Sequence, residues 1–237
     1  MNPFEKLQHI IAGRNVLLVG AGPMPYQCEE AENFDLTIAV NAGSDGRRGH
    51  LGNPEVLFVE ANVMLSKRKH YAKSRELVEQ NLAETRIILQ TNPGTKIPRW
   101  LINSSWQVIC HHQIHDNIRK VSDSHLFFQN WDNVPSSGLV TLAIIMGLGV
   151  KTLHMEGFSL VNASHNFEDP GHEQRFNQGY PARQHSRPDA ALLSLLSMKY
   201  KSITTCNPEL TPLLSSFEPS RRPNGDFGGG ILNRCYC

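Results

Sequence analysis

Histidine and serine side chains in two polar segments of this 237-residue chain could carry out acid–base chemistry and bind an anion. His185 lies late in the sequence, in the polar segment 184–188. An imidazole titrates near neutral pH, so His185 could act as a general base that removes a proton from an attacking hydroxyl group. The chain has 11 histidines, and a histidine taken at random is more often a surface or packing residue. His185 is therefore a candidate only in the company of other site residues.

Two serines and a glycine, Ser136, Ser137 and Gly138, precede an apolar run with helical spacing over residues 139–149. The N-terminus of a helix presents N–H groups and a partial positive charge, and serine hydroxyl groups add further donors. The segment could therefore bind a phosphate or a carboxylate group. Serine is also a preferred N-cap in helices that bind nothing, and for this segment alone the cap is the simpler interpretation.

A glycine-containing turn, Gly20-Ala21-Gly22-Pro23, follows the first strand-like apolar run. Glycines there let the backbone approach a nucleotide closely, or they simply permit a tight turn. The dinucleotide fingerprint needs a third glycine at position 25, which is Pro25, and an acidic residue after the second strand, where Asn41 stands. The chain also lacks the Gly-Lys-Ser/Thr of a Walker motif. Neither an NAD-dependent enzyme nor an ATPase is indicated.

Asn41 and Asn62 follow the second and third predicted strands. A side-chain amide offers both a donor and an acceptor to a base or a ribose. Asparagine also caps turns that bind no ligand. Ligands of doubly wound sheets bind outside the carboxyl ends of the strands, so both positions are candidate nucleotide contacts.

Short apolar runs alternate with helical patterns, which predicts an α/β fold with a parallel, doubly wound sheet. Strands are predicted at 16–19, 36–40, 56–59, 86–90, 106–110, 152–155 and 202–205. Helices are predicted at 71–83, 139–146 and 189–198, the last beginning at Asp189 directly after Pro188.

Charge and cysteine usage argue against several classes of protein. The formal net charge is +1, without the basic face of a nucleic-acid-binding protein. The sequence shows no secretory signal and no apolar run long enough to cross a membrane. Five cysteines without a Cys-X-X-Cys pair indicate neither a disulfide framework nor a zinc ribbon and fit the cytoplasm. His111, His112 and His115 are expected in a polar loop rather than in a metal site.

Taken together, these motifs resemble those of the bacterial sialyltransferases of glycosyltransferase family 42, over most of the chain. The family pattern begins with a strand, a Gly-X-Gly-Pro turn and an asparagine after the second strand. A Ser-Gly pair then opens a helix that ends in an Ala/Gly-Leu-Gly turn, and a later strand ends in a glycine-containing turn. A His-Ser pair before a helix follows, and then a strand followed by Cys-X-Pro or a similar group. The corresponding segments here are 20–23, Asn41, 137–138, 147–149, 155–158, 185–186 and 206–208.

The resemblance implies a single Rossmann-like, mostly parallel sheet of the GT-A variant type. It implies an inverting transferase that moves a sialic acid or related sugar acid from a CMP-activated donor to a glycan hydroxyl. No metal or other cofactor is expected, because the CMP leaving group carries a single phosphate. His185 would be the base. The implied donor-binding residues are Gly20, Ala21, Gly22, Pro23, Asn41, Asn62, Ser136, Ser137, Gly138, Glu156, Gly157 and Phe158.

The chain departs from the family pattern in two places. The family uses tyrosine hydroxyls near the leaving phosphate, where this chain offers His154 and Leu160. His154 is thus a second catalytic candidate, although a hydrogen-bonded core residue is the preferred interpretation. The family's arginine before the Ser-Gly pair is missing from the segment 133–135. These departures leave Kdo open as the transferred sugar in place of sialic acid.

The expected organisation is one glycosyltransferase domain, residues 1–218, and a flexible tail, residues 219–237. The polar segment 162–184 is expected to be a lid-like loop over the bound donor. The expected partners are the CMP-activated sugar acid and a glycan or glycolipid of lipopolysaccharide, lipooligosaccharide or capsule synthesis, in the cytoplasm at the inner face of the membrane. Contact of the tail with the membrane and assembly into a homo-oligomer are left open.

Two other functions also remain open. A pterin pyrophosphokinase-like enzyme can share the sheet and the glycine turn, but it should need acidic metal ligands, and no evident paired-carboxylate motif provides them. An S-adenosylmethionine-dependent methyltransferase, or a non-catalytic nucleotide-binding module, could also use the glycine turn. An acidic residue would then be expected where Asn41 stands.

Overall fold

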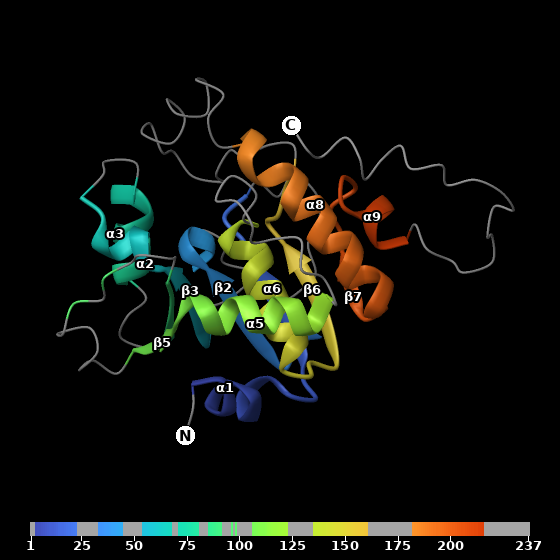
Figure 1. Ribbon diagram of the computed structural model, residues 1–237, viewed down its shortest axis with the longest axis horizontal. Coiled ribbons are helices and arrows are strands. Elements are labelled where there is room, and N and C mark those ends of the chain that lie inside the picture. Colours follow the sequence, from blue (N-terminus) through green and yellow to red (C-terminus); the bar gives the residue numbers. More distant parts are fainter. Residues whose placement is uncertain are drawn as a thin grey trace, which may run out of the picture.

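Parallel strands form a single sheet in the computed structural model of the protein, which describes residues 3–22, 33–44, 54–67, 71–80, 85–91, 96, 98, 106–122, 135–160 and 182–215. Within these ranges the sheet has seven strands in the order β5-β4-β3-β2-β1-β6-β7 (Figure 1). The strands are β1 (Asn15–Val19), β2 (Leu36–Val40), β3 (Val56–Glu60), β4 (Arg86–Gln90), β5 (Gln107–Ile109), β6 (Thr152–Glu156) and β7 (Ile203–Thr205). Every neighbouring pair is parallel, which confirms the predicted doubly wound sheet.

The strand order reverses at β1, which pairs with β2 on one side and with β6 on the other. Val19, the last residue of β1, lies opposite Ala39 of β2 and Glu156 of β6. Such a reversal leaves a crevice outside the carboxyl ends of the strands, where ligands bind. The predicted glycine turn follows β1 directly and therefore lies at this reversal.

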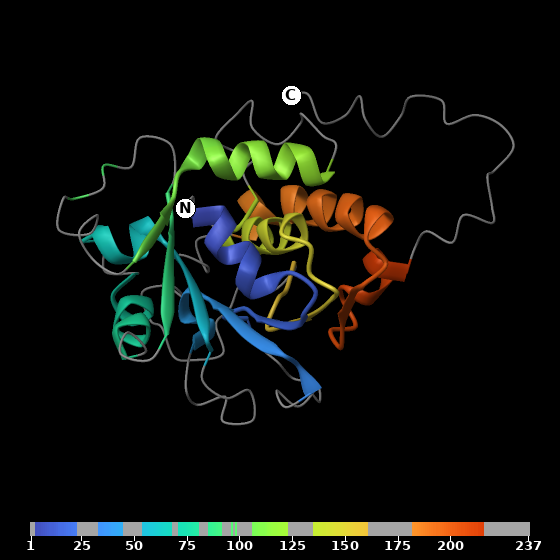
Figure 2. The ribbon, with the colours of Figure 1, turned by 90° about the horizontal axis from the view of Figure 1, so that it is seen from below.

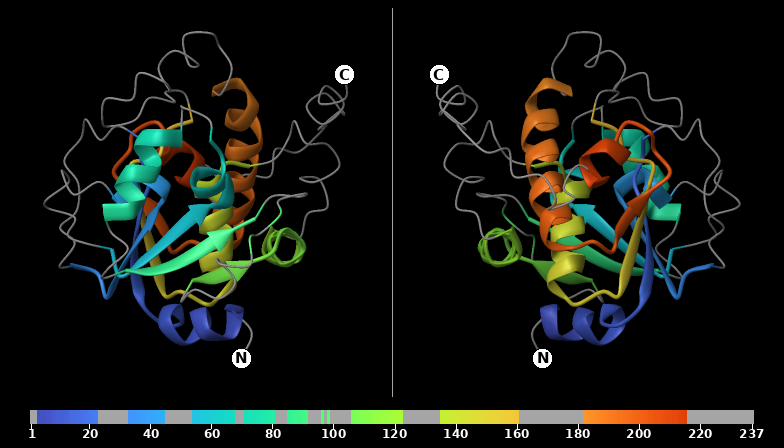
Figure 3. Two further views of the ribbon diagram at one scale, coloured as in Figure 1. Left: turned by 90° about the vertical axis from the view of Figure 1, so that its left-hand side faces the viewer. Right: turned by 90° about the vertical axis from the view of Figure 1, so that its right-hand side faces the viewer.

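Helices cover both faces of the sheet, as Figures 2 and 3 show. One face carries α1 (Pro3–Ile11), α5 (His111–Ser122), α6 (Ser137–Gly147) and α8 (Ala182–Lys199), and the other carries α2 (Ala61–Leu65) and α3 (Ala72–Gln80). The 3-10 helix η2 (Asn41–Ser44) follows β2, and α9 (Thr211–Ser215) follows β7. Along β1, Val16 and Leu18 join one core, while Leu17 and Val19 join the other. Strands buried on both faces read as continuous apolar runs, which is why the sequence revealed them.

The central helix of the first layer, α6, has no polar face over residues 139–146, all of which are buried. A helix of this kind is stable only when the protein encloses it. It begins two residues earlier than predicted, after Ser136, whose hydroxyl oxygen accepts a hydrogen bond from the N–H of Leu139 at 3.5 Å. The N-cap interpretation of Ser136 is therefore correct. The adjacent Ser137 contacts Glu60 at the end of β3, so this N-terminus lies at the carboxyl edge of the sheet.

Helix α8 begins earlier than the sequence indicated. It starts at Ala182 instead of Asp189, and Pro188 lies inside it. His185, expected in a loop before the helix, is therefore part of the helix, as are the last three residues of the expected lid. Proline destabilises a helix interior but is tolerated in the first turn, so Pro188 predicts that the helix begins there. Pro188 and Asp189 are buried, and tertiary packing outweighs the local signal here.

The three neighbouring histidines also lie in a helix, α5, and the predicted polar loop is wrong. Ile114, Ile118 and Val121 recur along α5 at helical spacing and are buried in the core. At its start, the side-chain oxygen of Gln113 accepts a hydrogen bond from the backbone N–H of Cys110 at 2.9 Å. This hydrogen bond is half of a capping box, a motif that marks the N-terminus of a helix. The prediction of a strand ending at Cys110 did not take this signal into account.

Several predictions concern segments that the structure does not describe. Residues 161–181, which hold most of the expected lid, and the domain boundary at 218 with its tail lie outside the described residues. Pro23 of the glycine turn also lies outside them. Within the described ranges, no helix combines the length and apolar character needed to span a bilayer.

Candidate active site

The turn after β1 is pressed against the turn after β6. The N–H of Gly20 donates a hydrogen bond to the carbonyl oxygen of Glu156 at 2.7 Å, and the N–H of Gly22 donates to that of Gly157 at 2.8 Å. A Cβ atom on Gly20 or Gly22 would overlap the carbonyl oxygen of Gly157. Both glycines are thus required by the close approach of two backbones. Ala21 between them is partly buried and packs against Leu77.

Phe158 joins this pair of turns to the N-terminus of α6. Its side chain is buried, and a Cβ atom on Gly138 would come within 2.5 Å of its ring. The same ring lies 3.2 Å from where a Cβ atom of Gly20 would stand. The predicted residues Gly20, Gly138 and Phe158 are therefore packed against one another at the carboxyl edge of the sheet.

Glu60, the last residue of β3, connects three predicted site residues. Its backbone N–H donates a hydrogen bond to Oδ1 of Asn41 at 2.8 Å. Its carboxylate accepts one from Nδ2 of Asn62 at 2.9 Å and one from the hydroxyl group of Ser137 at 3.0 Å. Asn41, Asn62 and Ser137 were identified independently, and the structure brings them together at the carboxyl ends of β2 and β3.

Glu60 itself was not among the predicted binding residues. The signal was present, because a charged residue closes an otherwise apolar strand at the edge where ligands bind. Asn41 has a positive φ of 49°, a left-handed conformation that asparagine tolerates better than most residues. Its backbone therefore fits the sharp change of direction from β2 into η2, while its side chain supports Glu60.

Asp189 of α8 supports the predicted anion-binding segment from the other side. Its Oδ1 atom accepts a hydrogen bond from the backbone N–H of Ser136 at 2.6 Å. Glu60 accepts a hydrogen bond from Ser137, so two carboxylates lie at the N-terminus of α6, where the helix dipole stabilises negative charge. His185 precedes Asp189 by four residues in α8, so the two positions share one face of that helix.

His154 lies in the core, as preferred from the sequence, with 7% of its surface exposed. Its Nδ1 atom lies 2.8 Å from Oγ1 of Thr204 and its Nε2 atom 2.8 Å from Oε1 of Glu156. The ring also packs against Phe34, with 5.7 Å between the centroids. Protein groups therefore engage both ring nitrogens, an arrangement that favours a structural role over contact with a leaving phosphate.

Comparison with known proteins identifies the fold. No protein-family model matches the chain, and no curated protein sequence matches it. Solved structures do match, among them the sialyltransferase CstII from Campylobacter jejuni in complex with CMP-3FNeuAc, at a TM-score of 0.55 and 16% identity over 84% of each chain. The fold is that of these sialyltransferases.

Two further structures show the same likeness. The monofunctional alpha-2,3-sialyltransferase Cst-I from Campylobacter jejuni gives a TM-score of 0.57 at 18% identity, over 91% of this chain and 83% of that one. CST-II in complex with a trisaccharide acceptor and CMP gives 0.54 at 15% identity, over 90% and 89%. A shared architecture at this identity leaves the chemistry to be argued from the site residues.

Proposed function

We propose that this protein is an inverting glycosyltransferase that moves a sialic acid or a related sugar acid, such as Kdo, from a CMP-activated donor to a glycan hydroxyl group. The observation that carries the proposal is the convergence of Asn41, Asn62 and Ser137 on Glu60, beside the strand reversal. This polar cluster lies where doubly wound folds bind nucleotides. The solved structures with this fold include complexes with CMP and with a CMP-sugar analogue.

In this proposal the cluster around Glu60 binds the cytidine. Carboxylate oxygens accept hydrogen bonds from ribose hydroxyl groups, and side-chain amides offer a donor and an acceptor to the base. The turn at Gly20 and Gly22 has no side chains at these two positions, so a nucleoside can approach its backbone closely. Glu156, Gly157 and Phe158 act indirectly, because they hold this turn in place.

The phosphate or the sugar carboxylate is assigned to Ser136, Ser137 and Gly138 at the N-terminus of α6. Backbone N–H groups and the helix dipole favour an anion there. Rotation of the Ser137 side chain would move its hydroxyl hydrogen bond from Glu60 to the ligand. Stabilising a phosphate monoester in this way needs no metal ion or other cofactor, which we propose for the transfer step.

His185 is proposed as the general base. As the acceptor hydroxyl oxygen bonds to the anomeric carbon, the bond from that carbon to the phosphate oxygen breaks, and CMP leaves with its electron pair. The acceptor proton passes to the imidazole of His185. Attack opposite the leaving group inverts the anomeric centre. We do not include His154 in this step, because its ring nitrogens face Thr204 and Glu156.

The acceptor is proposed to be a glycan or glycolipid of a bacterial surface polysaccharide, modified at the cytoplasmic face of the membrane. This assignment follows from the chemistry of sugar acids, which such polysaccharides contain. One structural neighbour was solved with a trisaccharide acceptor, and we propose that the acceptor of this protein is also a saccharide.

Calorimetric titration of the full chain with CMP, ATP and S-adenosylhomocysteine, each with and without EDTA, tests the proposal. We expect selective CMP binding that EDTA leaves unchanged, followed by release of CMP from CMP-sialic acid or CMP-Kdo only when a saccharide acceptor is present. Preference for ATP would instead support a pyrophosphokinase-like enzyme, and preference for S-adenosylhomocysteine a methyltransferase. Either preference would overturn the proposal.

A further inference from the structure

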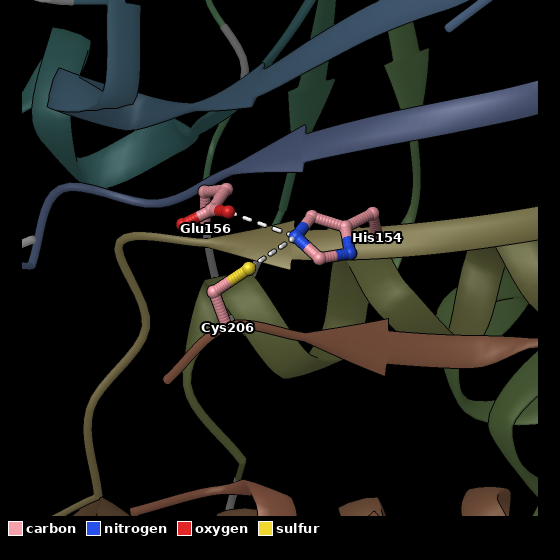
Figure 4. Close-up of side chains that lie close together, drawn as sticks. All are labelled: His154, Glu156 and Cys206. Carbon is pink, nitrogen blue, oxygen red and sulfur yellow. Dashed lines mark hydrogen bonds and ion pairs between the residues drawn. The ribbon is translucent and has the colours of Figure 1, made fainter. Parts of the chain in front are cut away.

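Three side chains with metal-binding atoms lie close together, two on β6 and one directly after β7. His154 and Glu156 are two residues apart on β6, so they point to the same face. His154 pairs with Thr204 of β7, and Cys206 follows Thr204 by two residues. The alternation of the strands therefore sets Cys206 beside Glu156. Figure 4 shows the three side chains converging.

The three side chains meet at a single atom, Nε2 of His154. Oε1 of Glu156 lies 2.8 Å from it and Sγ of Cys206 lies 3.6 Å from it. The donor atoms all lie within 4.8 Å of one another. This geometry excludes a thiol–imidazole–carboxylate relay, in which the thiol and the carboxylate must contact opposite ring nitrogens. Convergence on one side of the ring is the arrangement of ligands around a shared cation.

The buried carboxylate of Glu156 supports the same conclusion. The residue has no exposed surface, and its Oε2 atom has no hydrogen-bond partner among the described residues. A buried carboxylate is strongly destabilising unless hydrogen bonds or a cation compensate for its lost hydration. A cation between Glu156, His154 and Cys206 would provide that compensation.

We propose that His154, Glu156 and Cys206 bind Zn²⁺ as a structural site. Thiolate, imidazole and carboxylate are all zinc ligands, and the thiolate disfavours Mg²⁺ and Ca²⁺. With Zn–S of about 2.3 Å and Zn–N of about 2.0 Å, a tetrahedral site sets sulfur and nitrogen about 3.5 Å apart, close to the distance found. The carboxylate of Glu156 must move away from His154 by about 0.5 Å on the same geometry. Its second oxygen or a water molecule would complete the four ligands.

The surroundings of the three residues complete the site. Oγ1 of Thr204 can accept a hydrogen bond from Nδ1–H of His154, which leaves the Nε2 lone pair for the ion. Cys206 is only partly buried and offers a route for the metal to enter. The next residue, Asn207, donates a hydrogen bond through its side chain to the carbonyl oxygen of Phe158. The ion would thus tie β6 to the segment after β7, without taking part in the proposed transfer.

Cobalt titration tests the site directly. We expect the reduced, chelator-treated full chain to bind one Co²⁺ with a near-ultraviolet thiolate-to-cobalt absorption band, and Zn²⁺ to displace the cobalt. C206S should abolish the band, and E156Q should weaken binding on the order of 100-fold or more. T204V should weaken it by about 10- to 100-fold, the usual effect of an outer-shell partner.

Matched cysteine variants separate this site from other thiols. C110S changes the other described cysteine, and the double variant C235S/C237S removes the Cys-X-Cys pair at the C-terminus. Both should keep the wild-type band and affinity. Loss of the band in either control, its persistence in C206S, or the absence of cobalt binding to the folded wild type would overturn the proposal. Because none of these readouts involves CMP, they are independent of the proposed transferase activity.

Discussion

Asp189 of α8 accepts a hydrogen bond from the backbone N–H of Ser136, at the N-terminus of α6, with an N···O distance of 2.6 Å. Asp189 is almost fully buried, at 5% exposure, so water does not weaken the contact. The pair fixes the position of α8 relative to the proposed phosphate-binding segment. It therefore also sets the place of His185, which lies one helical turn before Asp189.

Replacing this carboxylate tests the coupling between the two helices. We expect Asp189→Asn to lower the free energy of unfolding by about 1–3 kcal/mol, because the amide oxygen can still accept the hydrogen bond from Ser136 but the negative charge that strengthens it and interacts with the helix dipole is lost. Urea unfolding measures the change. Glu79→Gln, on the exposed surface of α3, is the control and should stay within about 0.5 kcal/mol of wild type. Equal effects of the two variants would mean that Asp189 does not stabilise the α6 N-terminus.

Loss of the proposed base should separate binding from chemistry. We expect His185→Ala to reduce turnover of a CMP-sugar acid by roughly 100-fold or more and to leave CMP affinity almost unchanged, since the base acts on the acceptor. Turnover is measured by CMP release, and affinity by calorimetry. His9→Ala, at an exposed position of α1, should retain full turnover. Near-normal activity of His185→Ala would remove this residue from the mechanism.

Replacing the carboxylate of Glu60 is the clearest test of the proposed nucleotide site. We expect Glu60→Gln to weaken binding of CMP and of cytidine by roughly 10-fold, because one acceptor of the network around Asn62 and Ser137 becomes a donor. Calorimetry with both ligands measures this loss. Glu55→Gln alters the opposite end of the same strand, where Glu55 accepts a hydrogen bond from the N–H of Thr37. Equal weakening in both variants would show that Glu60 has no special part in binding.

The contact between Gly138 and Phe158 predicts strong sensitivity to a single methyl group. We expect Gly138→Ala to lower the free energy of unfolding by about 1–3 kcal/mol, because the new Cβ atom would overlap the phenyl ring. Combining it with Phe158→Leu should recover part of the loss, since the smaller side chain makes room. Thermal and urea unfolding of both single variants and the double variant give the interaction energy. Strictly additive effects would contradict the proposed overlap.

His111 should make stability depend on pH. Burial, together with the neighbouring His115 and His112, lowers the pKa of His111 in the folded protein. The unfolded chain then binds a proton more readily, so stability from this residue is lost as pH falls below the usual histidine pKa of about 6.5. The loss levels off below the folded-state pKa.

Urea unfolding at about pH 7.5 and about pH 5.5, on either side of the ordinary histidine pKa, measures this effect. His111→Gln should lose less stability between the two pH values than the wild type does. An equal loss in both proteins would assign the pH dependence to other groups.

The sequence predicted the sheet well because its strands are buried on both faces and therefore read as apolar runs. Asn41, Asn62 and Ser137 could also be found, since each follows a strand or opens a helix. Their meeting at Glu60 could not, because it depends on how β3 and α6 pack. Pro188 misled the prediction of α8, since a local helix-breaking signal carries no information about the packing that holds the helix together.

The close packing of the turns at Gly20, Gly22 and Gly157 limits how the proposed donor site could be redesigned. Because no side chain fits between the two backbones, these glycines offer no position at which a substitution could enlarge or reshape the proposed site. Directed evolution toward a different activated sugar would gain little from libraries at these glycines. Asn62, whose amide contacts the side chain of Glu60, is the better position to diversify, whereas the positive φ of Asn41 disfavours most other residues there.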